Sequence, residues 1–178
     1  MKKKRLIFIL AIIAIMASTA ISFAANSTTT SVTVTGSTNK MDATAVTVAA
    51  DRPSWSPTVN RAGEITQGEL FQIDATGNAS TEIIASLYVT NPDDLAKAYS
   101  YLNMTIAVYY EDTTDPLAPV WKELTTSDTA LLSLSNGYVT LKLTGREKYR
   151  IGVKEGSYYA LNTSVAANLA PQFTIDLR

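Results

Sequence analysis

TEIIASLYVTNPDDLAKAYSYLNMTIAVYYE, residues 81–111, is the stretch that decides the fold. Its two ends, Thr81–Thr90 and Leu102–Glu111, are rich in the β-branched and aromatic residues that favour strands. Between them, Asn91–Tyr99 carries the signals of a helix start: an Asn that can cap, a Pro suited to the first helical position, and two Asp residues that complement the helix dipole. The stretch predicts two long strands connected by one short helix.

Short segments of similar composition continue on both sides of this stretch, separated by turn residues. They are Ala43–Ala50, Glu69–Ala75, Val120–Leu124, Ala130–Leu134, Tyr138–Leu143, Tyr149–Lys154, Tyr158–Leu161 and Gln172–Leu177. Asn136-Gly137 is the sharpest turn signal and predicts a type I′ hairpin between two of them. The pattern predicts an all-β domain: a single antiparallel two-sheet sandwich, jelly-roll-like, with one short connecting helix and an extended N-terminal arm.

The residue types that are missing exclude several kinds of chemistry. The 178 residues contain no His and no Cys, so the chain lacks Ser-His-Asp and Cys-His catalysis and the usual nitrogen or sulfur ligands of zinc. Carboxylates occur at Asp93-Asp94 and between Glu111 and Asp115, where they suit a helix start and a solvated loop better than a catalytic pair. We expect no enzyme activity and no cofactor, with calcium as the alternative that oxygen ligands leave open.

The N-terminus predicts export. Residues 1–24 have a basic start at Lys2–Arg5, an apolar run at Leu6–Met16 and small residues before Ala25, the order of a secretory signal peptide. A retained transmembrane anchor and a pilin-type helix are the alternatives. Cleavage removes four basic residues and leaves 11 Lys+Arg against 16 Asp+Glu, a net charge of −5. We expect a secreted protein, extracellular or at the cell surface, with no nucleic-acid partner and no membrane contact after cleavage.

Residues 25–40, ANSTTTSVTVTGSTNK, form a distinct polar segment ahead of a sandwich domain at 41–178. Val32 and Val34 are its only large apolar side chains, so the segment alone cannot offset an ordering entropy of roughly 1–2 kcal/mol per residue. We therefore expect a flexible arm. The alternation of Ser31, Val32, Thr33, Val34 and Thr35 also predicts a strand wherever a partner sheet is offered.

Two kinds of surface site are suggested by residue type. Trp55, in the proline-rich loop Arg52–Pro57, and tyrosines on strands could stack on sugar rings, although aromatic residues are also enriched in strands for packing alone. Adjacent pairs such as Tyr158-Tyr159 must point to opposite faces of a strand. The Asn-x-Ser/Thr acceptors for N-glycosylation are Asn26, Asn78, Asn103 and Asn162.

The layout resembles a known family. A signal peptide and a polar arm precede a first strand at Thr44–Val48, a turn into a strand at Ile65–Asp74 and a long strand at Asn78–Asn91. In this order the chain resembles the secreted fibre-forming β-sandwich proteins of the TasA/camelysin type and the related archaeal bundling-pilus subunits. The resemblance implies donor-strand complementation, in which one subunit's arm completes a sheet of the next. The metalloprotease activity discussed for camelysin-type members does not carry over, because the chain has no His.

These observations lead to two main hypotheses. The first is a structural subunit of an extracellular filament or pilus, a homopolymer of the biofilm-matrix kind, with Ser31–Thr35 as the donor strand and Phe173, Thr174 and Ile175 as a wall of the acceptor groove. The second is a monomeric secreted module that binds cell-surface carbohydrate or an S-layer through Trp55 and exposed tyrosines. A hydrolase built on the Asp and Glu groups is a third, weaker reading.

Overall fold

The computed structural model describes residues 30–80, 82–124, 130–144 and 146–178. The predicted signal peptide at 1–24, the sequon at Asn26 and the first residues of the predicted arm lie outside the described residues. None of the helices in the described part is long and apolar enough to cross a membrane.

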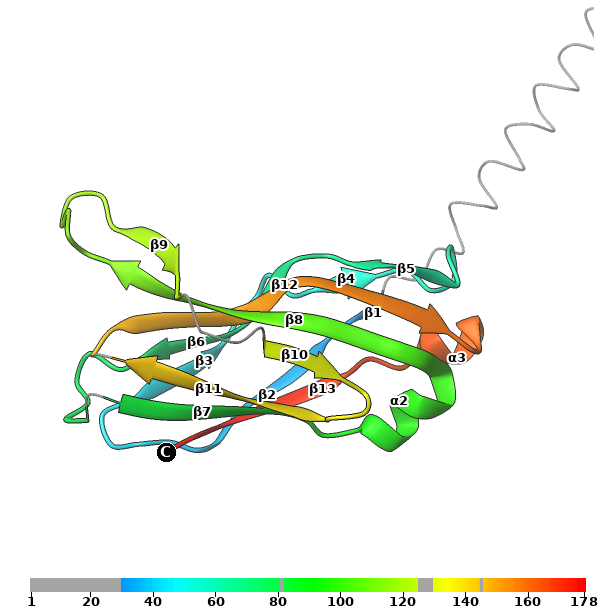
Figure 1. Ribbon diagram of the computed structural model, residues 1–178, viewed down its shortest axis with the longest axis horizontal. Coiled ribbons are helices and arrows are strands. Elements are labelled where there is room, and N and C mark those ends of the chain that lie inside the picture. The colour runs from blue at the N-terminus through cyan, green and yellow to red at the C-terminus, as the bar shows by residue number, and fades with distance from the viewer. Residues whose placement is uncertain (1–29, 81, 125–129, 145) are drawn as a thin grey trace, which may run out of the picture.

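Two β-sheets pack face to face (Figure 1). The larger one, hereafter the large sheet, has the order β10 (Ala130–Ser133), β8 (Tyr99–Asp112), β12 (Lys148–Ala160), β6 (Gly68–Asp74) and β3 (Ala45–Val48), with β5 (Ala62–Ile65) added to β12 and β9 (Val120–Glu123) added to β8. The small sheet has the order β11 (Tyr138–Thr144), β7 (Glu82–Val89), β13 (Gln172–Leu177) and β2 (Thr33–Asn39). A two-stranded ribbon joins β1 (Thr30–Ser31) to β4 (Ser54–Trp55). The predicted β-sandwich is confirmed.

The core lies between the two sheets and follows from period-two alternation. On β7, Ile83, Ala85 and Leu87 are fully buried while the residues between them face outward. Phe173 and Ile175 on β13 continue this buried layer. Leu102, Met104 and Ile106 on β8, among others, face it from the large sheet.

Among the residues that the structure describes, two helices rather than one close one end of the sandwich (Figure 1). The predicted helix is present as α2 (Pro92–Ala98). The second, α3 (Thr163–Ala166), was not expected, because it is a single turn with no apolar period of its own. Asn162 starts it by accepting hydrogen bonds from the backbone N–H groups of Ser164 and Val165 through its side-chain oxygen.

One predicted turn is continuous strand. Tyr149–Lys154 and Tyr158–Leu161 belong to the single long strand β12, and the Glu155-Gly156 pair between them does not turn. A Cβ at Gly156 would lie 2.8 Å from the carbonyl oxygen of Asn103 on β8. The glycine therefore marks a close approach of two backbones, which a single sequence does not distinguish from a turn.

The predicted type I′ hairpin at Asn136-Gly137 is also wrong. β10 pairs with β8 in the large sheet and β11 pairs with β7 in the small one, so the turn carries the chain between sheets. Gly137 has φ +65°, but Asn136 does not take the positive φ that a type I′ turn requires. Instead its side-chain oxygen accepts from Ser133 N at 2.8 Å and its amide donates to Leu131 O at 2.7 Å.

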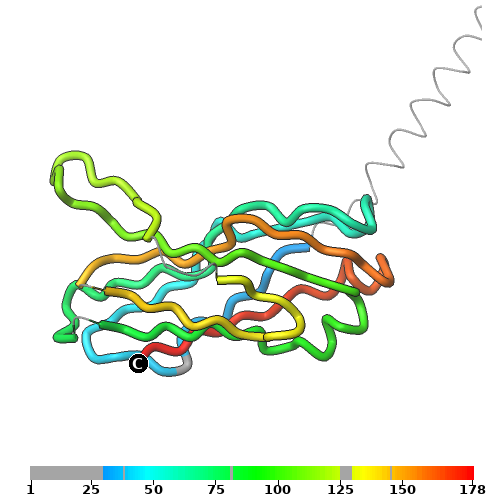
Figure 2. The backbone as a smooth tube through the Cα atoms, in the orientation of Figure 1, coloured from blue at the N-terminus to red at the C-terminus, as the bar shows by residue number. Residues whose placement is uncertain are grey.

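The N-terminal segment is not a free arm where the structure describes it. β2 pairs with β13 of its own chain, and this pairing is parallel (Figure 2, blue beside red), unlike the antiparallel sandwich expected. Val32 and Val34 are 1% and 9% exposed, so the sandwich already includes residues 30–39 and does not begin at 41. A flexible arm was expected because the segment alone cannot offset its ordering entropy. In the folded chain, the edge of β13 supplies hydrogen bonds and an apolar surface that offset this cost.

Candidate functional site

The outward face of the large sheet carries three adjoining hollows along β8 and β12, here together called the trough. Its middle is a hollow of about 650 Å³. A second hollow of about 400 Å³ adjoins the first at Gln67, and a third of about 490 Å³ adjoins it at Asn103. The trough therefore follows the long central strands rather than forming a closed pocket.

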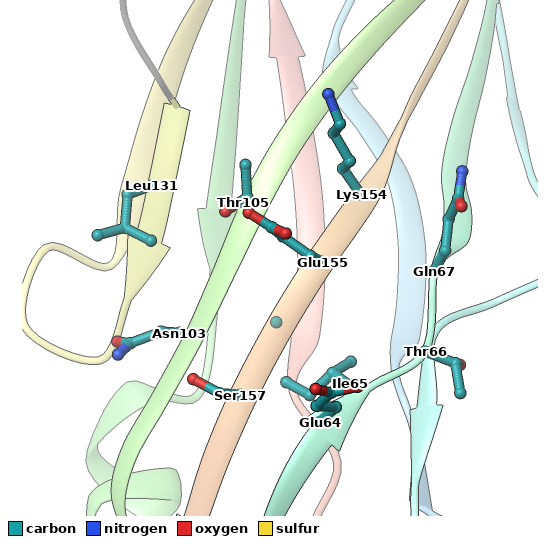
Figure 3. Close-up of a pocket in the computed structure, with 11 residues that line it drawn as sticks. Glu64, Ile65, Thr66, Gln67, Asn103, Thr105, Leu131, Lys154, Glu155 and Ser157 are labelled. Carbon is teal, nitrogen blue, oxygen red and sulfur yellow. The ribbon is translucent and has the colours of Figure 1, made fainter.

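The floor of the trough is made of small polar groups (Figure 3). Asn103 and Thr105 on β8 alternate with the buried Leu102, Met104 and Ile106 and so face outward. Ser157 on β12 is the cross-strand neighbour of Asn103. Gly156, at the close approach described above, also lines this hollow, and because it is a glycine it adds no side chain to the floor.

The walls of the trough come from the elements on either side of β8 and β12 (Figure 3). On one side, β5 and the turn after it contribute Glu64, Thr66 and Gln67. On the other side, β10 contributes Leu131, which is 48% exposed. The result is a long depression with an apolar rim on one flank and polar groups on the other.

A pair of tyrosines lies at one end of the trough. Tyr101 of β8 and Tyr159 of β12 are cross-strand neighbours whose ring centroids are 6.2 Å apart. They are 39% and 36% exposed. Tyr158, one residue earlier, is only 2% exposed, which confirms the prediction that this adjacent pair points to opposite faces.

Trp121 and Tyr109 line the other end of the trough. The guanidinium carbon of Arg150 lies 3.9 Å from the Trp121 ring centroid, a cation–π contact. Arg150 also donates from Nη1 to Glu69 Oε1 at 2.8 Å, so the cation that supports the indole is itself fixed. The indole therefore has a defined position at the sheet surface.

The cations that line the trough are both neutralised by carboxylates. Arg150 pairs with Glu69, and Lys154 Nζ lies 2.8 Å from Glu123 Oε2. The hydrogen bond with Glu123, assisted by its charge, raises the pKa of Lys154 above its ordinary value. Lys154 thus stays protonated and paired at neutral pH.

The structure does not display Trp55, which the sequence suggested as a sugar-stacking residue. Trp55 is 4% exposed and its Nε1 donates to the Tyr99 hydroxyl at 3.1 Å. That hydroxyl donates to Ala166 O at 2.9 Å, and burial raises the pKa of Tyr99. The proline-rich loop folds inward because β4 pairs with β1, so this prediction is wrong and Trp55 is a core residue.

The sequence suggested strand tyrosines as sugar-stacking groups, but it did not identify Tyr101, Tyr109 and Trp121 as parts of one site. Trp121 lies in the predicted strand Val120–Leu124, where an apolar residue precedes it and Lys122 and Glu123 follow it. The usable signal was the alternation of Asn103, Thr105 and Tyr109 with apolar residues, which places them on one face of β8. Trp121 lies beside that face because β9 pairs with β8, and this pairing cannot be read from the local pattern.

The predicted donor and acceptor residues lie side by side within one chain. Thr33 N donates to Pro171 O at 2.7 Å, and Thr35 Oγ1 donates to Phe173 O at 2.8 Å. Thr174 Oγ1 donates to Gly36 O at 2.9 Å. Of the predicted donor strand, residues 33–35 therefore lie beside the strand that holds Phe173, Thr174 and Ile175 in the small sheet, whereas Ser31 pairs with Ser54 of β4.

The three sequons in the described residues differ in exposure. Asn78 is 4% exposed and its amide donates to Thr44 Oγ1 at 2.6 Å, so glycosylation there would require this buried contact to open. Asn103 is half-buried in the trough floor. Asn162 is exposed, at the start of α3.

The two carboxylate groups do not share a cleft. Asp93 and Asp94 lie in the first turn of α2, whereas Glu111 and Asp112 end the 14-residue strand β8 that follows. At about 3.3 Å per residue the groups are separated by roughly 40 Å. Within the described ranges, no three or more Asp and Glu residues gather in a way that could hold a metal ion.

No family model and no curated protein matches the chain. Among solved structures, the chain is similar to the CBM22-1 xylan-binding domain from Paenibacillus barcinonensis Xyn10C, at 10% sequence identity and a TM-score of 0.26. The match covers 75% of this chain and 93% of that domain. A TM-score this low does not relate the two chains residue by residue.

Proposed function

We propose that the protein is a non-enzymatic, exported module that binds an extended polysaccharide along the trough. The observation that supports this proposal is the combination of a polar floor, whose central groups are Asn103, Thr105 and Ser157, with aromatic groups at both ends of one face. The floor groups Asn103, Thr105 and Ser157 can both donate and accept hydrogen bonds, as sugar hydroxyls do. The aromatic groups provide flat apolar surfaces for the apolar faces of sugar rings.

Trp121 is the residue whose loss tests this proposal most directly. Replacing Trp121 with Ala is expected to weaken polysaccharide binding by at least about tenfold, because interface energy concentrates in a few aromatic groups. Binding is measured by affinity electrophoresis and isothermal titration calorimetry on a panel of xylan, cellulose-derived, mannan and chitin-derived chains. Circular dichroism verifies that the variant is folded.

Tyr138→Ala is the matched control. Tyr138 is 55% exposed and stacks on Tyr88 at 5.9 Å, but it lies on the small sheet. Its loss should leave binding unchanged. The proposal fails if the native chain binds no member of the panel, or if Trp121→Ala and Tyr138→Ala bind equally well.

A second candidate function is a filament subunit that assembles by exchange of the N-terminal strand. The observation that favours it is the position of β2, a terminal edge strand connected to β3 by a short loop. In that loop Ala43 has φ +56°, a conformation that costs a residue other than Gly about 1–2 kcal/mol. If the loop opened, residues 33–39 could make the same contacts with β13 of another copy, and the contact would propagate because it does not close.

Engineered cysteines distinguish exchange from self-pairing, since the native chain has none. Thr33 and Gln172 are in register across β2 and β13, within the range that a disulfide spans. If strands exchange, a mixture of Thr33→Cys chains and Gln172→Cys chains should form crosslinked dimers, and the double variant should form a ladder on a denaturing gel. A mixture of Thr33→Cys with Thr140→Cys, on the opposite edge strand β11, is the control. A double variant that closes only on itself, with no crosslink in the first mixture, rules out exchange.

A further inference from the structure

We infer that the ligand of the trough is an uncharged polysaccharide chain long enough to contact both aromatic ends at once, and that polyuronates are rejected. This inference rests on the proposed function and specifies its ligand class. It follows from two features of the trough, the distance between its aromatic ends and the distribution of its charges.

The aromatic ends are too far apart for a short ligand. Tyr101 and Tyr109 lie on the same face of β8, eight residues apart. At roughly 3.3 Å per residue this separation is about 26 Å. The floor between them consists of Asn103, Thr105 and the neighbouring Ser157, which offer hydrogen bonds but no aromatic surface. A trisaccharide can contact one aromatic end only. A longer chain contacts both ends at once, and its affinity is higher because the second contact is intramolecular.

The charges of the trough disfavour an anionic chain. Its two cations, Arg150 and Lys154, are already paired with Glu69 and Glu123. Three further carboxylates line it, those of Asp51, Glu64 and Glu155, and none of them forms an ion pair within the described part of the chain. A polyuronate would therefore meet unbalanced negative charge in the lining of the trough and find no available cation there.

The same three carboxylates would attract a cationic chain, so the preference for a neutral chain over a cationic one rests on the hydrogen-bonding groups and the aromatic ends. The polar groups that reach the floor are an amide and two hydroxyls, and the aromatic ends favour the apolar faces of neutral rings. Glu155 also lies close enough to Lys154 to interact with its charge. The arrangement is suited to hydroxyl-rich, uncharged sugars.

The test measures affinity against chain length. Titration calorimetry compares trimers and hexamers of xylose, glucose, mannose and N-acetylglucosamine with oligogalacturonate and chitosan hexamers. For the neutral series that binds, the hexamer should bind at least about tenfold more tightly than the trimer. Tyr101→Ala or Tyr159→Ala should reduce this ratio to near one, whereas Tyr138→Ala should leave it unchanged.

Charge selection is tested separately. The double variant Glu64→Gln/Glu155→Gln should increase oligogalacturonate binding several-fold, with the neutral hexamer as the reference ligand. Equal affinities of trimer and hexamer would overturn the inference, and so would an oligogalacturonate or chitosan hexamer that binds the native chain as tightly as the best neutral hexamer. Absence of binding to every chain is a different result, because it removes the proposed function itself.

Discussion

Deletion of residues 30–39 is expected to lower the free energy of unfolding by about 3–6 kcal/mol, enough to unfold many domains of this size. The deletion removes the burial of Val32 and Val34, each worth about 1.5–3 kcal/mol. It also exposes the edge of β13 and removes the hydrogen bonds that Thr35 and Thr174 make across it. Urea denaturation of the chain without the predicted signal peptide, with and without the segment, measures the loss.

A synthetic peptide of residues 30–39 provides the control for this deletion. Added in excess to the shortened chain, it should restore stability in proportion to the logarithm of its concentration, because it binds only the folded state. The same peptide with Val32→Asp and Val34→Asp should not. An unchanged denaturation midpoint after deletion would contradict the structural role of the segment. Rescue would also show that the strand can act in trans, as the filament candidate requires.

Trp55→Ala is expected to cost about 3–5 kcal/mol of stability, the range for truncating a large buried aromatic side chain. Trp55 packs against Tyr99 and Tyr158 at ring-centroid distances of 6.4 and 6.2 Å, and its Nε1 donates a hydrogen bond to the Tyr99 hydroxyl. Thermal denaturation by circular dichroism measures the change. Polysaccharide binding should persist below the lowered melting temperature, because Trp55 does not line the trough.

Trp121→Ala is the matched comparison for Trp55→Ala. Its indole is half-buried and contacts Arg150, so its loss should cost only about 1 kcal/mol of stability while polysaccharide binding weakens by at least about tenfold. We therefore expect Trp55→Ala to affect mainly stability and Trp121→Ala to affect mainly polysaccharide binding. A result in which Trp55→Ala is as stable as the native chain but fails to bind would reverse this assignment and restore the role that the sequence first suggested.

Strand positions were predictable because side-chain alternation is a local property. Val120–Leu124, Ala130–Leu134 and Gln172–Leu177 match β9, β10 and β13 to within one residue. The short helix after Asn91 was predictable for the same reason, since its start signals are adjacent in sequence. Local patterns, however, do not state which strands pair. The turn at Asn136-Gly137 has the composition of a hairpin, yet its flanking strands enter different sheets.

The trough was only partly predictable. The sequence placed tyrosines on strands and required Tyr158 and Tyr159 to face opposite ways, but it did not show which of them faces the core. Trp55 and Trp121 both lie beside polar residues, and only the pairing of β4 with β1 and of β9 with β8 makes one buried and the other a surface group. The exposure of an aromatic residue depends on what covers it, which is a long-range property.

By itself, the sequence determined the all-β class, the position of most strands, the connecting helix and the absence of His- or Cys-based chemistry, because these depend on residue type and nearest-neighbour alternation. Tertiary structure decided the rest. It placed residues 33–39 beside β13, brought Gly156 close to the backbone of β8 and aligned two distant aromatic groups along one face. Each of these depends on contacts between segments far apart in the chain, whose free energy is gained only when both partners are in place.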